Sequence, residues 1–357
     1  MKIHVGNRKE DFVFVSLLKN CAKNKDLCKG ISVHDEIVKK GLLAKSSYIA
    51  STLIHMYVKC DDLARAQQIL DELPVRDVVS WSALIAGYVQ QRKAREALNC
   101  FEQMRHEGIT PNVVIFTCIL KAYAITGTIE KGKQIHDEVI NRGLLVEDIV
   151  LGNALVNMYV KCGNITKAQK LLQELPERDV VSWNIIIAGY AQQGQAHDAL
   201  NCFKHMRGEG IFPNSVTFVC ILNACSHSGL SDDAEMFFGS MSRDYGIIPN
   251  LEHYTCMVVL CGCAGHFEKA LSMIKTMPSS VYPSAWLSLL GACKKWGNVE
   301  IGREAFECAV KLNAKHDAAY LLMFQIYEDA HMFEDAKKIE AMRMKFVGKC
   351  LHDFDFL

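Results

Sequence analysis

Apolar residues recur along the chain at helical spacing, in runs of about a dozen residues separated by short polar turns. In the stretch that begins at Val78, for example, Trp81, Leu84, Ile85 and Tyr88 fall on one side of a helix. No stretch alternates with the period of two that is typical of strands. The pattern therefore predicts an all-α protein.

A second apolar run follows the first and completes a hairpin. Ala97, Leu98 and Phe101 again have helical spacing, Gly108 ends this second helix, and Pro111 prevents it from resuming. We therefore expect helical hairpins, each made of two helices and a turn.

The hairpins repeat at a fixed distance along the chain. RDVVSW begins at Arg76 and again at Arg178, and MYVKC begins at Met56 and again at Met158, a lag of 102 residues in both cases. Insertions would have destroyed this phase, and a fixed repeat is typical of a solenoid. The predicted fold is an α-solenoid superhelix of stacked helical hairpins.

Composition sets limits on function. The formal net charge is zero, but residues 1–60 carry 11 Lys and Arg against 5 Asp and Glu, so this end is the better place for contact with a polyanion. No apolar run approaches the roughly 18 residues that a membrane helix needs. Many of the 15 cysteines recur at the 102-residue lag, and no CxxC occurs. They are expected to be buried packing residues in a reducing compartment rather than disulfides or metal ligands.

Three repeat lengths, 31, 35 and 36 residues, make up the 102. The sequence VVSWSALIAGYVQQRKAREALNCFEQMRHEGITPN (78–112) resembles a pentatricopeptide repeat. FTCILKAYAITGTIEKGKQIHDEVINRG (116–143) and GNALVNMYVKCGNITKAQKLLQELPERD (152–179) resemble the long and short variants of the plant PLS class. Tetratricopeptide repeats, the main alternative, would give a uniform period of about 34 residues.

The resemblance implies eight repeats over 11–282, followed by two extension motifs over 283–350 and a short tail over 351–357. The repeats are long 11–46, short 47–77, standard 78–112, long 113–148, short 149–179, standard 180–214, long 215–250 and short 251–282.

The family also implies a ligand and a way of reading it. Such repeats bind single-stranded RNA, one base per repeat, through two or three side chains. By resemblance these are the fifth and the last residue of a repeat, while the second residue sandwiches the base. The base-reading pairs are Ser51 with Asp77, Ser82 with Asn112, Thr117 with Asp148, Asn153 with Asp179, and Asn184 with Asn214. The stacking residues are Val79, Val150 and Val181.

By the family's code these pairs suggest, in chain order, G, A, a purine, U and a pyrimidine with C favoured, although long repeats often discriminate poorly. The predicted core is N-G-A-N-U-Y-N-N. Val15 and Val219 depart from the pattern because an apolar fifth residue cannot hydrogen-bond a base, and Thr255 is paired with an unusual Tyr282. Simpler roles stay open: the closing residues could cap the next helix, and the valines could only pack between helices.

Two motifs imitate enzyme sites. Residues 127–133 nearly match a P-loop, but Gln134 stands where a Ser or Thr would hold magnesium, and no strand precedes it. HDE at His34 and at His136 matches half of the zinc-deaminase signature, without its PCxxC. Gly127 lies at the turn of a helical hairpin and the two HDE copies lie at the same phase of the repeat, so we expect no catalytic residue, metal or cofactor and no deaminase domain.

The predicted function is a sequence-specific RNA-binding adaptor for organellar transcripts, specifying a site of C-to-U editing. A DYW-type deaminase would act in trans and dock on residues 283–350, which could instead only cap the array. The alternatives are a factor for RNA stability, splicing or translation, a protein-interaction scaffold, and a truncated product of a longer gene. No membrane partner is expected. The family implies an organelle, and we expect the mitochondrion, with the chloroplast as the alternative, although no transit peptide is recognisable.

Overall fold

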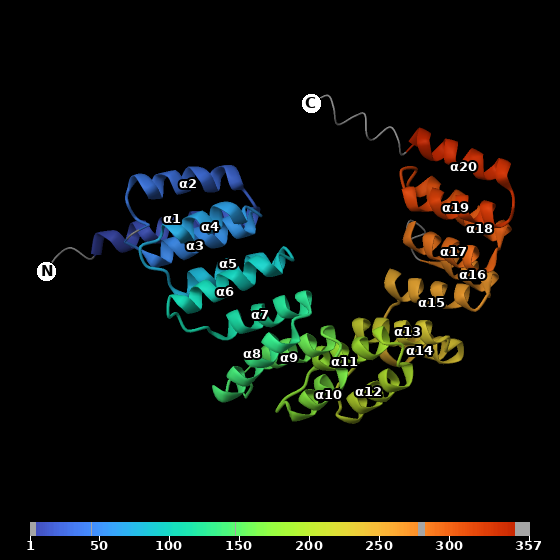
Figure 1. Ribbon diagram of the computed structural model, residues 1–357, viewed down its shortest axis with the longest axis horizontal. Helices are drawn as coiled ribbons and strands as arrows, with labels where there is room; N and C mark the ends of the chain where they lie inside the picture. The colour runs from blue at the N-terminus through green and yellow to red at the C-terminus, as the bar shows by residue number, and fades with distance from the viewer. Residues whose placement is uncertain (1–4, 44, 147, 278–282, 347–357) are drawn as a thin grey trace. The chain divides into compact units, whose positions relative to one another are not determined.

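The computed structural model describes residues 5–43, 45–146, 148–277 and 283–346, and these residues contain helices, turns and no strand. The chain divides into two compact bodies, an N-terminal body over residues 1–178 and a C-terminal body over 179–357. The predicted all-α array of helical hairpins is confirmed (Figure 1).

The N-terminal body holds five hairpins. Its helices are α1 (Val5–Asn24), α2 (Leu27–Lys39), α3 (Ser47–Lys59), α4 (Leu63–Glu72), α5 (Val78–Gln90), α6 (Ala94–His106), α7 (Val113–Thr126), α8 (Ile129–Asn141), α9 (Ile149–Lys161) and α10 (Ile165–Glu174). The described part of α1 begins six residues before the expected start of the first repeat, because residues 5–10 contain no proline that would stop a helix.

The C-terminal body also holds five hairpins. Its helices are α11 (Val180–Gln192), α12 (Ala196–Gly208), α13 (Ser215–Ser228), α14 (Ser231–Tyr245), α15 (Leu251–Cys263), α16 (Phe267–Thr276), α17 (Pro283–Trp296), α18 (Val299–Leu312), α19 (Asp317–Asp329) and α20 (Phe333–Phe346).

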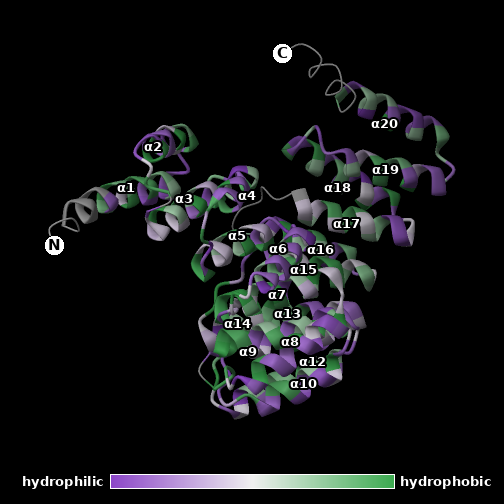
Figure 2. Ribbon diagram, turned by 60° about the vertical axis from the view of Figure 1, so that its left-hand side comes forward, coloured by the Kyte–Doolittle hydropathy of each residue, from purple (hydrophilic) through white to green (hydrophobic). Residues whose placement is uncertain are grey.

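The first helices of the hairpins form a continuous row within each body. In the N-terminal body α1, α3, α5, α7 and α9 contact one another in turn, and in the C-terminal body α11, α13, α15, α17 and α19 do the same. Apolar residues are interspersed with polar ones along these helices (Figure 2), and most of the apolar ones fill the core between neighbouring hairpins. From α3 to α17, each first helix begins at the first residue of a predicted repeat or of the extension motifs. The division into long, short and standard types stays a prediction.

The repeated HDE and MYVKC motifs are joined by a hydrogen bond between the histidine of one and the tyrosine of the other. His136 Nδ1 lies 2.8 Å from the Tyr159 hydroxyl, and His34 Nδ1 lies 2.9 Å from that of Tyr57. Each bond ties the second helix of one hairpin to the first helix of the next. HDE is thus part of the scaffold.

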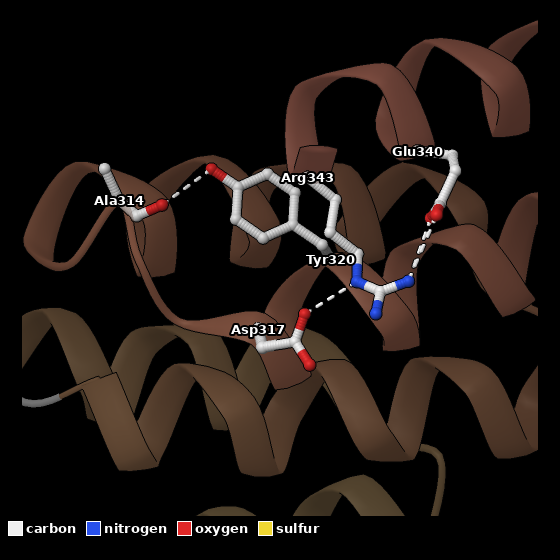
Figure 3. Close-up of polar contacts among 5 residues, drawn as sticks. All are labelled: Ala314, Asp317, Tyr320, Glu340 and Arg343. Atoms are coloured by element: carbon white, nitrogen blue, oxygen red, sulfur yellow. Dashed lines mark hydrogen bonds and ion pairs between the residues drawn. The ribbon is translucent and has the colours of Figure 1, made fainter. Parts of the chain in front are cut away.

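The last hairpin, α19 with α20, is held by polar contacts at one end (Figure 3). Arg343 Nε donates to Asp317 at 2.6 Å, and its Nη1 donates to Glu340 at 3.1 Å. The Tyr320 hydroxyl donates to the carbonyl of Ala314 at 3.0 Å, which ties α19 to the turn before it. The remainder of the predicted second extension motif, 347–350, and the tail 351–357 lie outside the described residues. Within the described part, no helix is long and apolar enough to span a bilayer.

Candidate nucleic-acid interface

Apart from Tyr282, which lies outside the described residues, the closing residue of each predicted repeat caps the first helix of the next one. Asp77 accepts from the backbone N–H of Ser80 at 2.8 Å, and Asp148 accepts from that of Leu151 at 2.9 Å. Asn112, Asp179 and Asn214 cap their helices in the same way. The capping role expected as an alternative is therefore real, and it holds one oxygen of each side chain in place at the start of a first helix.

In repeat 78–112 the fifth and the closing residue meet. Asn112 Oδ1 accepts from the N–H of Ile115 at 2.9 Å, so the other side of its amide, Nδ2, faces Ser82 and donates to Ser82 Oγ at 3.3 Å. The Ser82 hydroxyl donates to the carbonyl of Val78 at 2.6 Å. The pair therefore has one remaining amide proton, on Asn112, to offer a ligand.

In repeat 180–214 the pair offers both a donor and an acceptor. Asn214 Oδ1 accepts from the N–H of Thr217 at 3.0 Å and from Asn184 Nδ2 at 3.2 Å. Because Asn184 must turn its NH2 group toward this oxygen, its own Oδ1 points the other way. That Oδ1 is buried and has no hydrogen-bond partner in the described part of the protein. Asn214 keeps its NH2 group for a ligand.

The other predicted pairs are less closely joined. The Ser51 hydroxyl donates to the carbonyl of Tyr48 at 3.2 Å, and the Thr117 hydroxyl to that of Val113 at 2.9 Å, so each uses its proton inside its own helix. No hydrogen bond joins either of them to its closing residue among the described residues. Asn153 and Asp179 fall in different bodies of the chain.

The second residues of the repeats form an exposed apolar series beside these pairs. Val79, Val150 and Val181 are 49–56% exposed, whereas the third residues that follow them in the same helices are buried. A valine that stays about half exposed contributes little hydrophobic stabilisation to packing between helices. This exposure favours contact with a ligand over packing between helices as their role.

The closing residues divide by the hydrogen bond they can make. A carboxylate only accepts, so Asp77, Asp148 and Asp179 suit a base with an imino N–H, which guanine and uracil have. The amide of Asn112 or Asn214 can donate, which suits the unprotonated ring nitrogen of adenine or cytosine. This chemistry agrees with the bases that the family code suggests for four of the five pairs, and with a purine that is guanine for Thr117 with Asp148.

The P-loop-like segment has a structural role. Gly127 ends α7 with φ of 70°, a left-handed conformation that favours glycine. A Cβ on Gly132 would lie 2.6 Å from Met158 Sδ, so this glycine allows two helices to pack closely.

The expectation that the cysteines are buried packing residues holds for many of them but is wrong for Cys28 and Cys263, which are exposed. Burial determines the state of the buried ones. It raises the pKa of Cys100 and of Cys202 to about 12, which keeps them as neutral thiols. The cysteines within the described ranges are all free, and no group of three or more His, Cys, Asp or Glu side chains there is placed to hold a metal.

The sequence pattern did not predict one feature of this edge, a set of exposed apolar side chains. The residue two before the closing residue is an exposed large apolar side chain in four repeats. The four are Val75, Val146, Phe212 and Ile248. A comparison of the copies at the 102-residue lag could have singled out Phe212, which stands where the first copy has Thr110.

The structure is that of a helical-repeat protein. Its stacked hairpins carry paired polar residues at the start of their first helices. The chain belongs to the pentatricopeptide repeat family. Two models of this family match: the PPR repeat family at 76–125 and 178–227, and the PPR repeat at 48–78, 114–144, 153–180, 216–245 and 252–280.

Several plant proteins are similar to the chain. The chloroplastic pentatricopeptide repeat-containing protein CRR2 of Arabidopsis thaliana is 36% identical, over 97% of this chain and 54% of its own length. A mitochondrial pentatricopeptide repeat-containing protein of the same plant is 37% identical, over 90% of this chain and 57% of its own. The chain thus spans about half the length of these relatives.

A solved structure has the same fold. The crystal structure of the pentatricopeptide repeat protein PPR10, in complex with an 18-nucleotide psaJ RNA element, superposes with a TM-score of 0.72 at 19% identity. The match covers 90% of this chain and 48% of PPR10.

Proposed function

We propose that this protein binds single-stranded RNA in a sequence-specific manner, one nucleotide per repeat. The observation that carries the proposal is the Asn184–Asn214 pair. It presents a buried acceptor without a protein partner in the described part, next to an amide donor that the helix cap holds in place. A buried polar atom without a partner costs about 1–3 kcal/mol. A rotation of the Asn184 side chain on RNA binding would bring this oxygen to the hydrogen-bonding edge of a base, which would satisfy it.

The surroundings of the pair support the same ligand. Val181 lies exposed at the second position of the same helix, where it can contact the face of a base while Asn184 and Asn214 contact the edge. The same combination recurs in repeat 78–112 with Val79, Ser82 and Asn112. PPR10, which has this fold, was crystallised with RNA.

The proposed target is an organellar transcript, at a site of C-to-U editing whose deaminase is supplied in trans. Relatives named chloroplastic and mitochondrial support an organelle. The mitochondrion is the proposed one, with the chloroplast as the alternative. The hairpins from α17 onward, with the segment up to residue 350, would receive the deaminase. A factor for RNA stability, splicing or translation would use the same reading edge without a deaminase.

Selection from a randomised RNA pool tests RNA reading. We expect enrichment of a core that contains GANUY. No enrichment of any sequence would contradict both RNA functions and would leave a protein-interaction scaffold as the remaining candidate.

A single substitution tests which residues read the base. Ser82→Asn, with Asn112 unchanged, gives repeat 78–112 the pair found in repeat 180–214. The preference at that one nucleotide should move from A toward a pyrimidine, because the longer asparagine side chain has a separate NH2 donor and carbonyl acceptor where serine has a single hydroxyl. The matched variant Asn184→Ser should move the other nucleotide in the opposite direction. Unchanged profiles in both variants would contradict the assigned readers.

Editing needs a separate experiment. Loss of the gene should abolish C-to-U conversion at an organellar transcript site that matches the selected core. Conversion that continues at every such site, with altered abundance or splicing of the same transcript, would favour the second function.

A further inference from the structure

A cavity of about 570 Å³ opens at the junction of two repeats in the C-terminal body. It is lined by the loop between α12 and α13 and by the end of α14, with Arg207, Phe212, Asp244 and Tyr245 among its walls. The second helices end where the first helices begin, because the two run antiparallel within a hairpin. The cavity is therefore at the same edge as the base-reading residues.

Phe212 is the most conspicuous part of this wall. Its side chain is 84% exposed. It precedes Asn214 by two residues, so the two Cα atoms are at most about 7 Å apart. An aromatic ring this close to a base-reading residue can stack on a base.

Arg207 supplies a cation to the same cavity. Its guanidinium lies over the ring of Tyr245, 5.8 Å from the centroid, and that ring packs edge-on against Phe218 at 5.2 Å. Arg207 has no ion pair and donates no side-chain hydrogen bond in the part of the chain that the structure describes. The nearby carboxylate of Asp244 is engaged by Arg243 at 2.8 and 3.1 Å. The donors of Arg207 are thus available to an anion.

The first copy of this junction is closed. Arg105, the counterpart of Arg207, pairs with Glu138 at 2.5 Å, and Glu138 also pairs with Arg142 at 2.5 Å. Arg142 in turn donates to the carbonyl of Pro111 at 3.1 Å and lies over Phe116.

Three substitutions between the copies account for the open junction. At the 102-residue lag Glu138 becomes Ser240, Arg142 becomes Asp244, and Thr110 becomes Phe212. The ion pairs that close the first junction therefore cannot form in the second, where an aromatic ring is added.

The repeat beside the open junction lacks a polar fifth residue. Repeat 215–250 has Val219 at that position, whereas its first copy has Thr117. A valine cannot hydrogen-bond the edge of a base. A nucleotide at this repeat must be held in another way if the RNA strand continues along the row.

The geometry points to a nucleotide-binding subsite in this cavity, which takes a nucleotide of the bound RNA strand by stacking its base on Phe212 and contacting a phosphate with Arg207. The inference rests on the proposed RNA-binding function. It adds a contact that holds one nucleotide without selecting its base, at the repeat that has lost its polar fifth residue.

Replacing Phe212 tests the subsite. Phe212→Thr restores the residue of the first copy and should weaken binding of the selected RNA roughly 5- to 150-fold, the range for loss of one stacking contact. With 2-aminopurine at the nucleotide assigned to repeat 215–250, stacking should quench its fluorescence in the wild type and not in the variant. Val146→Thr is the matched control, since Val146 is an exposed apolar residue at the same phase beside the closed junction. It should leave affinity unchanged.

Arg207→Gln tests the phosphate contact. It should lower the number of neutralised phosphates by about one, seen as a shallower dependence of affinity on salt. The subsite is wrong if the wild type binds RNA through Ser82 and Asn184 but Phe212→Thr changes neither affinity nor fluorescence, or if Val146→Thr weakens binding equally. Failure of the wild type to select any RNA would instead overturn the proposed function, and the subsite with it.

Discussion

Repeats 78–112 and 180–214 have the same helices, the same caps and much of the same sequence, and they differ at 12 of 35 positions. The first pairs Ser82 with Asn112 and has Thr110 before it in the loop, while the second pairs Asn184 with Asn214 and has Phe212. What the copies share is the scaffold, from Trp81 and Trp183 to the glycine and proline that end each hairpin. The core changes that occur keep an apolar residue, as where Leu84 becomes Ile186, whereas the changes in polarity lie at the reading edge or at exposed positions. The comparison therefore separates folding from recognition.

The largest effect should come from the shared core. Trp81 is fully buried and Trp183 nearly so. Trp81→Ala and Trp183→Ala should each lower the free energy of unfolding by about 3–5 kcal/mol, because a large cavity remains in the array. Urea unfolding followed by circular dichroism measures this. A loss below about 1 kcal/mol at either site would show that the copies do not share their core.

The same two residues also allow a finer comparison. Trp183 Nε1 donates to Glu209 at 3.2 Å, whereas Trp81 Nε1 is buried without a partner in the described part. Trp183→Phe should therefore cost about 1 kcal/mol more than Trp81→Phe, since only the former loses a hydrogen bond. Equal costs would mean that the Glu209 contact contributes nothing.

The repeat pattern predicted most of the scaffold and part of the edge. The 102-residue lag located the helix starts, and the family resemblance placed Asn184 and Asn214 at one edge. The sequence could not show which amide atom remains for a ligand, because that depends on the orientation that the cap of α13 gives to Asn214. It also missed the cavity beside Phe212, since this depends on ion pairs between residues far apart in sequence, such as Arg105 and Glu138.

A third copy of the short repeat extends the comparison to pH. The third residue of the three short repeats is Ile49, Leu151 and His253 in turn, and all three are buried. His253 Nδ1 accepts from the N–H of Asn250 at 3.1 Å, so its Nε2 carries the proton and donates to the carbonyl of Ser215 at 2.9 Å. Protonation of Nδ1 would break the bond to Asn250.

Burial lowers the pKa of His253 below its ordinary value, although the bond to Ser215 opposes this. The unfolded chain therefore binds more protons below about pH 6.5, and stability should fall as the pH drops from there toward the lowered pKa. His253→Leu, which copies Leu151, should make this fall shallower, as measured by urea unfolding between about pH 7 and 5. An unchanged slope would show that His253 does not titrate with folding. His136 is the control: its pKa is also lowered by burial, so part of the slope should remain.

The smallest effect concerns the turns inside the hairpins, where the two periods differ consistently. The left-handed turn residue is Gly127, Gly163 and Gly194 in the second period, but Lys25, Asp61 and Arg92 at the same phase in the first, with φ between 53° and 63°. A side chain in this conformation costs roughly 1–2 kcal/mol, which the flexibility of glycine in the unfolded chain partly offsets. Arg92→Gly should therefore raise the free energy of unfolding by about 0.5–1 kcal/mol, and Gly194→Arg should lower it by a similar amount. Asp61→Gly should raise the free energy of unfolding by less than Arg92→Gly does, because aspartate tolerates this conformation better and its carboxylate lies 3.4 Å from Lys25 Nζ.

A loss of stability in Arg92→Gly would mean that the arginine makes a stabilising contact. The charged turns of the first period would then need a functional explanation of their own.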